Sequence, residues 1–447
     1  MATPDYSDTS YRRAWSLAWP IILSNSSIPL VGAVDTAVMG HMPEAAYVGA
    51  VALGANLFSI IYWSFGFLRM GTTGFVAQAA GAGDGAEVRA ALQRALSIAL
   101  VLALAIWALQ APIALAAFSV IEASGQVEAL TRTYFEWRIW SAPAVLANYA
   151  ILGTLIGLQR TRDVLLVQLL LNGTNIGLDL LFVPVLGWGI EGVAAASVVA
   201  EYAAVAGGLA LLAIRLRRLP GRERIVTLFE PAALRALIAV NGNIFVRTVL
   251  LVLAFFYFAA VGARMGDTVV AANAILMQLQ LFLAYGLDGF AHAAEGLTGA
   301  ACGARNRARF RAAVRTTTVC ALAVAGGYTL VYALFGPMFI GWMTDLPEVR
   351  ERAGAYLAWM IAAPLISVWS FQLDGVFIGA TRTAEMRNGM ILSAIGFWLA
   401  VQVLVPWLGN HGLWLALMLF LGLRALTLGY WLPRLVRAQG APSHEVA

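Results

Sequence analysis

The sequence VDTAVMG (residues 34–40) closes the first long apolar stretch of the chain and places one carboxyl group, that of Asp35, inside it. A charged aspartate at the centre of a bilayer costs about 2.5–3.5 kcal/mol even on the lenient insertion scale. Aspartates in such segments are rare, and they usually face a cavity or a partner. Asp35 is therefore the first candidate for a functional residue, provided that the surrounding stretch spans a membrane.

The composition of the whole chain is that of a membrane protein. Its 447 residues are 61% hydrophobic and 12% charged, with a mean hydropathy of +0.78, whereas soluble domains carry about 25% charged residues. Cys302 and Cys320 are too few and too isolated for a disulfide framework or a metal site, and no cofactor is predicted. The first apolar run is too long for a cleavable signal peptide and lacks its cleavage site, which indicates a retained first helix.

Apolar segments recur along the whole sequence. A helix that spans a bilayer needs about 20 apolar residues, and twelve segments reach this length. They predict an all-α polytopic membrane protein with twelve transmembrane helices. The predicted spans lie near residues 14–40, 46–80, 91–119, 133–158, 163–184, 190–214, 235–262, 269–301, 313–340, 353–379, 386–406 and 412–433.

Arginines are concentrated in every second loop. By the positive-inside rule this side is cytoplasmic, and so are both termini. The basic loops are explained by topology and by contact with anionic lipid, so no nucleic-acid partner is predicted. We expect a multi-pass monomer in a bacterial inner membrane. The opposite loops hold Arg132, Arg138, Arg264, Arg350 and Arg352.

The longest basic loop, residues 215–230, divides the helices into two sets of six. We predict an N-terminal lobe of residues 1–218, with the cation and substrate site, and a C-terminal lobe of residues 219–447. The halves match at an offset of 222 positions, at which Gly81-Ala82 falls on Gly303-Ala304. Because six is even, the repeats run parallel about an axis along the membrane normal, as in many transporters. A substrate path is expected between the lobes.

The repeat separates residues needed for the fold from residues kept for chemistry. At the 222 offset, Asp35 falls on Tyr257, Asp179 on Val401 and Glu201 on Leu423. The first lobe therefore has intramembrane acids that the second lobe lacks. A functional role is favoured for Asp35 and Asp179, whereas for Glu201 a structural role is about equally favoured.

Asp35 and Asp179 are expected to meet, because each lies about five residues before the outer end of its helix. The spacing of Asn172, Asn175 and Asp179 puts them on one helix face, and Asn148 on the fourth span approaches the same interior. A lone intramembrane asparagine more often joins helices than binds a ligand. Two carboxylates in a dry place do not both ionise readily, which is the chemistry of a proton acceptor.

Other polar residues have weaker or ambiguous signals. Asp374, near the inner end of the tenth helix, is as readily structural as functional. Pro20 in the first helix is either a static kink or a hinge that lets the helix bend when Asp35 changes charge. Asp288 and Glu295 lie toward the cytoplasmic end of the eighth helix and either pair with Arg247 or reach water. Arg69 and Arg424 are as readily structural partners of acids as ligands.

Three motifs resemble one transporter family. The sequence VDTAVMGH at 34–41 is similar to the first-helix motif of the MATE multidrug and toxic-compound extrusion transporters, in their DinF-type branch. The sequence NIGLDLLF at 175–182, followed by GWGIEG at 187–192, resembles the family's fifth-to-sixth helix signature, and DGVFIGATR at 374–382 its tenth-helix motif. The resemblance covers nearly the whole chain and implies a MATE/MOP-type fold and an outward pump driven by a proton or sodium gradient.

The resemblance also implies roles for individual residues. In DinF-type members the first-lobe site includes acids that match Asp35 and Asp179, with an asparagine matching Asn175 nearby and a bending proline matching Pro20. Asn148 matches a further member of that network. The NorM branch relies on second-lobe acids, one of which matches Asp374. Tyr257 stands where an acid would be needed for a NorM-like site on the seventh helix.

The expected function is a proton-coupled antiporter that exports small amphipathic, often cationic, drugs or toxic organic compounds. A sodium-coupled exporter, with Na⁺ at Asp35 and Asp179, is a variant. A lipid-linked oligosaccharide flippase of the same superfamily is the runner-up, but it needs a large cationic central cavity, and intramembrane arginines are few. A channel is disfavoured by the one-sided acid set. An enzyme is disfavoured because the histidines are scattered, at His41, His292, His411 and His444.

Overall fold

The computed structural model describes residues 6–42, 44–120, 123–221 and 230–439. The regular structure in these ranges is helical. The elements are α1 (Tyr11–Gly40), α2 (Ala46–Trp63), α3 (Phe67–Gly81), α4 (Gly85–Ala108), α5 (Gln110–Val120), α6 (Gly125–Arg138), η1 (Ile139–Ser141), α7 (Ala142–Gly157), α8 (Thr161–Phe182), α9 (Ile190–Leu216), α11 (Pro231–Ala263), α12 (Asp267–Gly303), α13 (Arg307–Met343), α14 (Pro347–Gly379), α15 (Thr383–Leu408) and α16 (Asn410–Ala438).

Twelve helical stretches in the described ranges are long and apolar enough to cross a bilayer, which confirms the predicted all-α membrane fold. The third span is shorter than predicted, because α4 ends at Ala108 and α5 follows as a separate apolar helix. Pro112 gives a physical reason, since it has no N–H to donate to the carbonyl of Ala108. Residues 222–229 of the predicted boundary loop lie outside the described residues.

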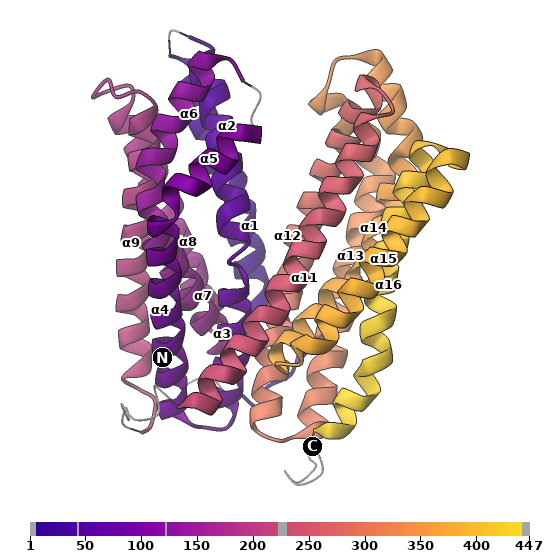
Figure 1. Ribbon diagram of the computed structural model, residues 1–447. Helices are drawn as coiled ribbons and strands as arrows, with labels where there is room; N and C mark the ends of the chain where they lie inside the picture. The colour runs from indigo at the N-terminus through magenta and orange to yellow at the C-terminus, as the bar shows by residue number, and fades with distance from the viewer. Residues whose placement is uncertain (1–5, 43, 121–122, 222–229, 440–447) are drawn as a thin grey trace.

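The helices gather into two groups in Figure 1. Helices α1–α9, indigo to magenta, lie on one side, and α11–α16, red to yellow, lie on the other. The groups approach each other toward the lower end of the view, where α1 begins and α16 ends, and they diverge toward the upper end. We call them the first and the second lobe below.

The lobes meet through two glycines that occupy equivalent repeat positions. A Cβ on Gly81 of α3 would lie 2.0 Å from the carbonyl oxygen of Ala300, and a Cβ on Gly303 of α12 would lie 1.8 Å from that of Gln78. Small residues spaced four apart let helix backbones touch inside a membrane. The symmetric contact of α3 with α12 therefore depends on the absence of side chains at both positions.

Two spans of the first lobe are interrupted where their repeat partners are not. The second span breaks into α2 and α3 around residues 64–66, and the fourth breaks at η1, Ile139–Ser141. The corresponding helices of the second lobe, α12 and α14, run unbroken. The first lobe therefore has two helix breaks where α12 and α14 of the second lobe are continuous. Short 3₁₀ segments within helices often mark functional hinges.

A valine at Gly303 should separate the lobes. We expect Gly303→Val to lower the stability of the purified protein by about 1–3 kcal/mol, the usual cost of overpacking. Thermal unfolding in detergent measures it. Gly327→Val on α13 is the control, because a Cβ there meets nothing within 4 Å. Equal melting temperatures for the two variants would contradict a tight contact at Gly303.

Candidate functional site

Asp35 and Asp179 face each other between α1 and α8. Asp35 is 8% exposed and Asp179 is fully buried, and their side chains lie against each other. Two carboxyl groups in contact in a dry place do not both ionise readily. The Oδ1 atoms of both aspartates have no hydrogen-bond partner among the described residues. The pair therefore keeps unused acceptor capacity.

One face of α8 carries the polar residues next to this pair. Asn172 donates from Nδ2 to Ser27 Oγ of α1 at 2.7 Å, and Asn175 lies 3.2 Å from Ser197 Oγ of α9. With its amide turned so that nitrogen faces the acid, Asn175 donates to Asp179 Oδ2 at 3.3 Å and accepts from Ser197. Amide orientation follows from the network, and this orientation gives Asp179 a donor. These bonds join α1, α8 and α9 around the pair.

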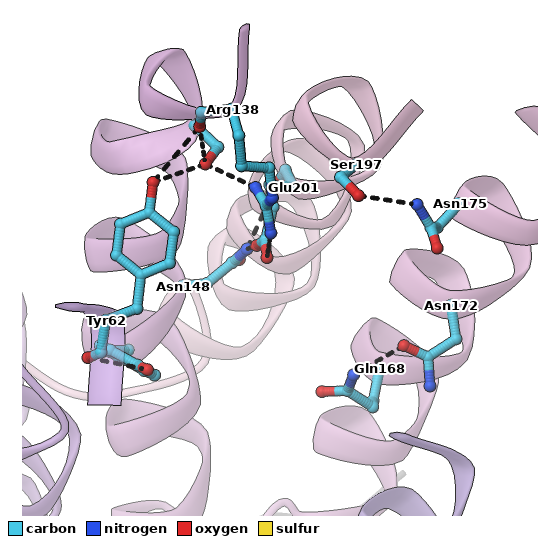
Figure 2. Close-up of polar contacts among 10 residues, drawn as sticks. Tyr62, Arg138, Asn148, Gln168, Asn172, Asn175, Ser197 and Glu201 are labelled. Atoms are coloured by element: carbon cyan, nitrogen blue, oxygen red, sulfur yellow. Dashed lines mark hydrogen bonds and ion pairs between the residues drawn. The ribbon is translucent and has the colours of Figure 1, made fainter. Parts of the chain in front are cut away.

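Glu201 and Asn148 form a second polar group beside it (Figure 2). Asn148 donates from Nδ2 to Glu201 Oε2 at 2.8 Å and to the Glu201 carbonyl oxygen at 3.2 Å. Glu201 lies one turn after Ser197 on α9, so both side chains project from the same helix face. The structure thus brings the predicted residues of the first lobe into one region.

Arg138 is the main member of this region that the sequence analysis misplaced. It was assigned to an outer loop, whereas it ends α6 and its side chain is 14% exposed, with a nitrogen 3.7 Å from Glu201 Oε1. Its guanidinium lies 5.7 Å from the ring centroid of Tyr62. Tyr62 in turn bonds Ser141 Oγ at 2.7 Å. The loop assignment is wrong because α6, η1 and α7 follow one another in a single apolar stretch, Gly125–Gly157, and Arg138 lies inside it.

Tyr257 lies apart from these acids, on α11 of the second lobe. Its hydroxyl accepts from Gln402 Nε2 at 3.2 Å, and its ring packs edge-on against Phe397 at 6.2 Å between centroids. These partners belong to α15. The structure therefore places Tyr257 in the second lobe's own packing.

Asp374 belongs to a buried charge cluster of the second lobe. Its Oδ2 accepts hydrogen bonds from both Arg247 and Arg424, the latter at 2.7 Å. A further ion pair joins the lobes, with Arg69 Nη1 of α3 lying 3.4 Å from Glu295 Oε2 of α12. Two guanidinium groups neutralise Asp374, which gives it a different environment from that of Asp35.

Pro20 is buried within an unbroken α1, which also contains Pro29. Close to it, α1 contacts the second lobe, because a Cβ on Gly289 of α12 would lie 2.4 Å from Ile22 Cγ1 and 2.9 Å from the Ala18 carbonyl oxygen. The proline thus lies where α1 touches α12, well before Asp35 on the same helix.

In the described parts of the chain, no three His, Cys, Asp or Glu side chains gather as a metal site would require.

Known proteins resemble this chain along most of its length. The MatE family model matches residues 20–181 and 244–407. The DNA damage-inducible protein F of Escherichia coli is 42% identical over 426 residues, which cover 94% of this chain and 91% of that protein.

Solved structures share the fold. A transporter of the MOP superfamily from Pyrococcus furiosus has a TM-score of 0.87 at 19% identity, covering 99% of this chain and 100% of that one. An outward-facing multidrug resistance MATE family transporter has a TM-score of 0.85 at 20% identity, covering 98% and 97%.

Removing one guanidinium from the Asp374 cluster should be costly. We expect Arg424→Met to destabilise the protein by about 3–5 kcal/mol, because it leaves a buried carboxylate short of a partner. The double variant Arg424→Met/Asp374→Asn should recover part of that loss. Thermal unfolding checks both, with Arg437→Met at the exposed end of α16 as the control. A single variant no less stable than this control would show that the cluster is not structural.

Proposed function

We propose that this chain, which belongs to the MatE family of multidrug and toxic-compound transporters, is a proton-coupled antiporter that exports amphipathic, often cationic, compounds across a bacterial inner membrane. Members of this family are secondary transporters, so an ion gradient supplies the energy and the protein performs no covalent chemistry.

The paired carboxyl groups of Asp35 and Asp179 carry the proposal. A pair that shares one proton takes up a second proton to become neutral, or releases its proton to become a site for an organic cation. Protonation and substrate binding then compete for the same charge. A ligand shifts a conformational equilibrium only through different affinities for its states, and this competition supplies the coupling between proton and substrate.

Helix α1 connects the pair to the second lobe in this proposal. Asp35 lies near the outer end of α1, and the segment around Pro20 packs on Gly289 of α12. Proline removes one backbone hydrogen bond, so bending there is less costly than elsewhere in the helix. When protons neutralise Asp35 and Asp179, α1 rearranges near Pro20 and the substrate leaves. Deprotonation toward the cytoplasm resets the site.

The arginine distribution supports the direction of transport. It favours cytoplasmic termini, and with that orientation the diverging ends of the lobes in Figure 1 would face outward. A structural relative is described as outward-facing. Protons entering from outside reach the first lobe from this side.

Buried charges disfavour the flippase alternative. A lipid-linked oligosaccharide carries phosphate groups, which need unpaired cations in a central cavity. Four of the buried or half-buried arginines already pair with carboxylates, and they are Arg69, Arg138, Arg247 and Arg424. The sodium variant remains compatible with the oxygen ligands at Asp35 and Asp179, and the experiment below separates it.

Replacing Asp35 should abolish coupling. Proteoliposomes receive a fluorescent cationic dye and either a proton or a sodium gradient, one at a time. We expect wild-type efflux under the proton gradient only, and at least a tenfold loss in Asp35→Asn. The control is Asp345→Asn, because Asp345 is fully exposed between α13 and α14. If Asp35→Asn keeps wild-type coupled efflux, the assignment of Asp35 is overturned. If the sodium gradient alone drives wild-type efflux, sodium is the coupling ion instead of the proton.

Restoring a backbone hydrogen bond at Pro20 should slow the transport cycle. We expect Pro20→Ala to lower the dye efflux rate several-fold while the equilibrium binding of dye stays close to wild type, since the Asp35–Asp179 pair is untouched. Pro29→Ala is the matched control, because Pro29 lies in the same helix but is exposed. Equal efflux rates for Pro20→Ala and wild type would argue that the kink is static.

A further inference from the structure

We propose that Arg138 is a positioning residue of the proton site: paired with Glu201, it supplies the positive charge that allows the Asp35–Asp179 pair to release its proton. The inference rests on the proposed proton exchange at this pair. It concerns a residue outside the carboxyl pair, and it is carried by contacts and burial rather than by family resemblance.

The local structure holds the Arg138 side chain inside the first lobe. Its nitrogens contact Glu201 at 3.7 Å (Figure 2) and Ser141 Oγ. Its guanidinium also lies over two aromatic rings, 5.7 Å from the centroid of Tyr62 and 5.9 Å from that of Phe58. Cations over aromatic faces are favoured when they are desolvated. These four contacts keep a charged group in an apolar lobe and fix its position.

The interrupted helices converge on Arg138. Helix α2 ends one residue after Tyr62, and α6 ends at Arg138 itself, where η1 begins. The bond between Tyr62 and Ser141 joins the two interruptions at 2.7 Å. Broken membrane helices typically occur where a ligand or ion is handled, because the irregular backbone needs a polar lining.

A short polar path connects Arg138 with the aspartates. Glu201, its ion-pair partner, shares a face of α9 with Ser197. Ser197 contacts Asn175 at 3.2 Å, and Asn175 reaches Asp179 at 3.3 Å. Helix α9, which carries Glu201 and Ser197, packs against both α6 and α8, so Arg138 and the aspartate pair belong to the same packed group of helices.

The groups that face Arg138 show why its charge matters. They come from every neighbouring element and are Asp35 of α1, Tyr62 of α2, Tyr134 of α6, Tyr149 of α7, Asp179 of α8 and Glu201 of α9. When the pair has released its proton, three carboxylates face one guanidinium. Charges interact more strongly in a poorly polarisable interior than in water. Without Arg138 the last proton would therefore be held more tightly.

The repeat comparison supports a role beyond packing. At the 222 offset, Arg138 falls on Met360, Tyr62 on Ala284 and Glu201 on Leu423. The second lobe packs apolar side chains where the first has this cation and its partners. The set is thus confined to the lobe that holds the aspartate pair, as expected if it serves that pair.

Infrared titration of the full chain in lipid nanodiscs tests the proposal without any substrate. The carboxyl band that disappears in Asp35→Asn reports the protonated pair. We expect Arg138→Gln to move the midpoint of this band to higher pH by about one unit or more, which is the usual effect of losing an opposite charge nearby. Arg138→Lys, which keeps the charge, should stay near wild type.

Two further variants keep the test decisive. Glu201→Gln removes a like charge and should move the midpoint to lower pH, even if Arg138→Gln does not fold. Arg132→Gln is the control on the same helix, because Arg132 pairs with Glu128 at an exposed position and should leave the midpoint unchanged.

A purely structural role predicts a different pattern. The variants would then melt earlier while the midpoint stays in place, and that result, or equal shifts in Arg138→Gln and Arg132→Gln, would overturn the proposal. Failure of the proposed function gives a different result. The rate of dye efflux would then be the same with and without a proton gradient, although the carboxyl band still shifts in Arg138→Gln and Glu201→Gln.

Discussion

A carboxylate in hydrocarbon is stable only if another group compensates its charge, and this constraint shapes both lobes. In the second lobe, two guanidiniums compensate Asp374 at all times. In the first lobe, Asp35 and Asp179 face each other, and the compensating group that we propose for them is a proton. The first arrangement is a fixed ion-pair cluster, and the second would give the proposed transport cycle a group whose charge can change. The difference in chemistry between the lobes follows from which compensating group each one uses.

The backbone also differs between the lobes, because helices are interrupted only in the lobe that holds the aspartate pair when the second and fourth spans are compared with α12 and α14. Helices α12 and α14 are continuous, whereas their counterparts break around residues 64–66 and at Ile139–Ser141. Tyr62, just before the first break, bonds Ser141 in the second, and Arg138 directly precedes the second break. The close contact of α3 with α12 involves neither break. Local rearrangement at the acids is therefore compatible with a contact between the lobes that stays in place.

Much of this arrangement is predictable from sequence, because membrane proteins obey strong local rules. Segment length and apolarity predict the twelve spans, and helix depth brings Asp35 to Asp179. Apolarity alone does not predict the breaks within helices, although Ser64 and Gly66 lie in the first break and Pro143 follows the second at the start of α7. Arg138 was misplaced because the rule that assigns arginines to loops ignores those with buried acidic partners. The repeat comparison contains the missing signal, since Met360 occupies the equivalent position.

The glycine contact between α3 and α12 has a consequence for how the two halves change over evolutionary time. Gly81 and Gly303 occupy equivalent places in the repeat, and each touches the backbone of the opposite half. A side chain at either glycine would displace the backbone of the other half, so neither position accepts a larger residue on its own. No such reciprocal contact ties Asp35, Asp179 and Glu201 to their equivalents Tyr257, Val401 and Leu423. The likeness between the halves is therefore more visible at the seam between them than at the acids of the first half.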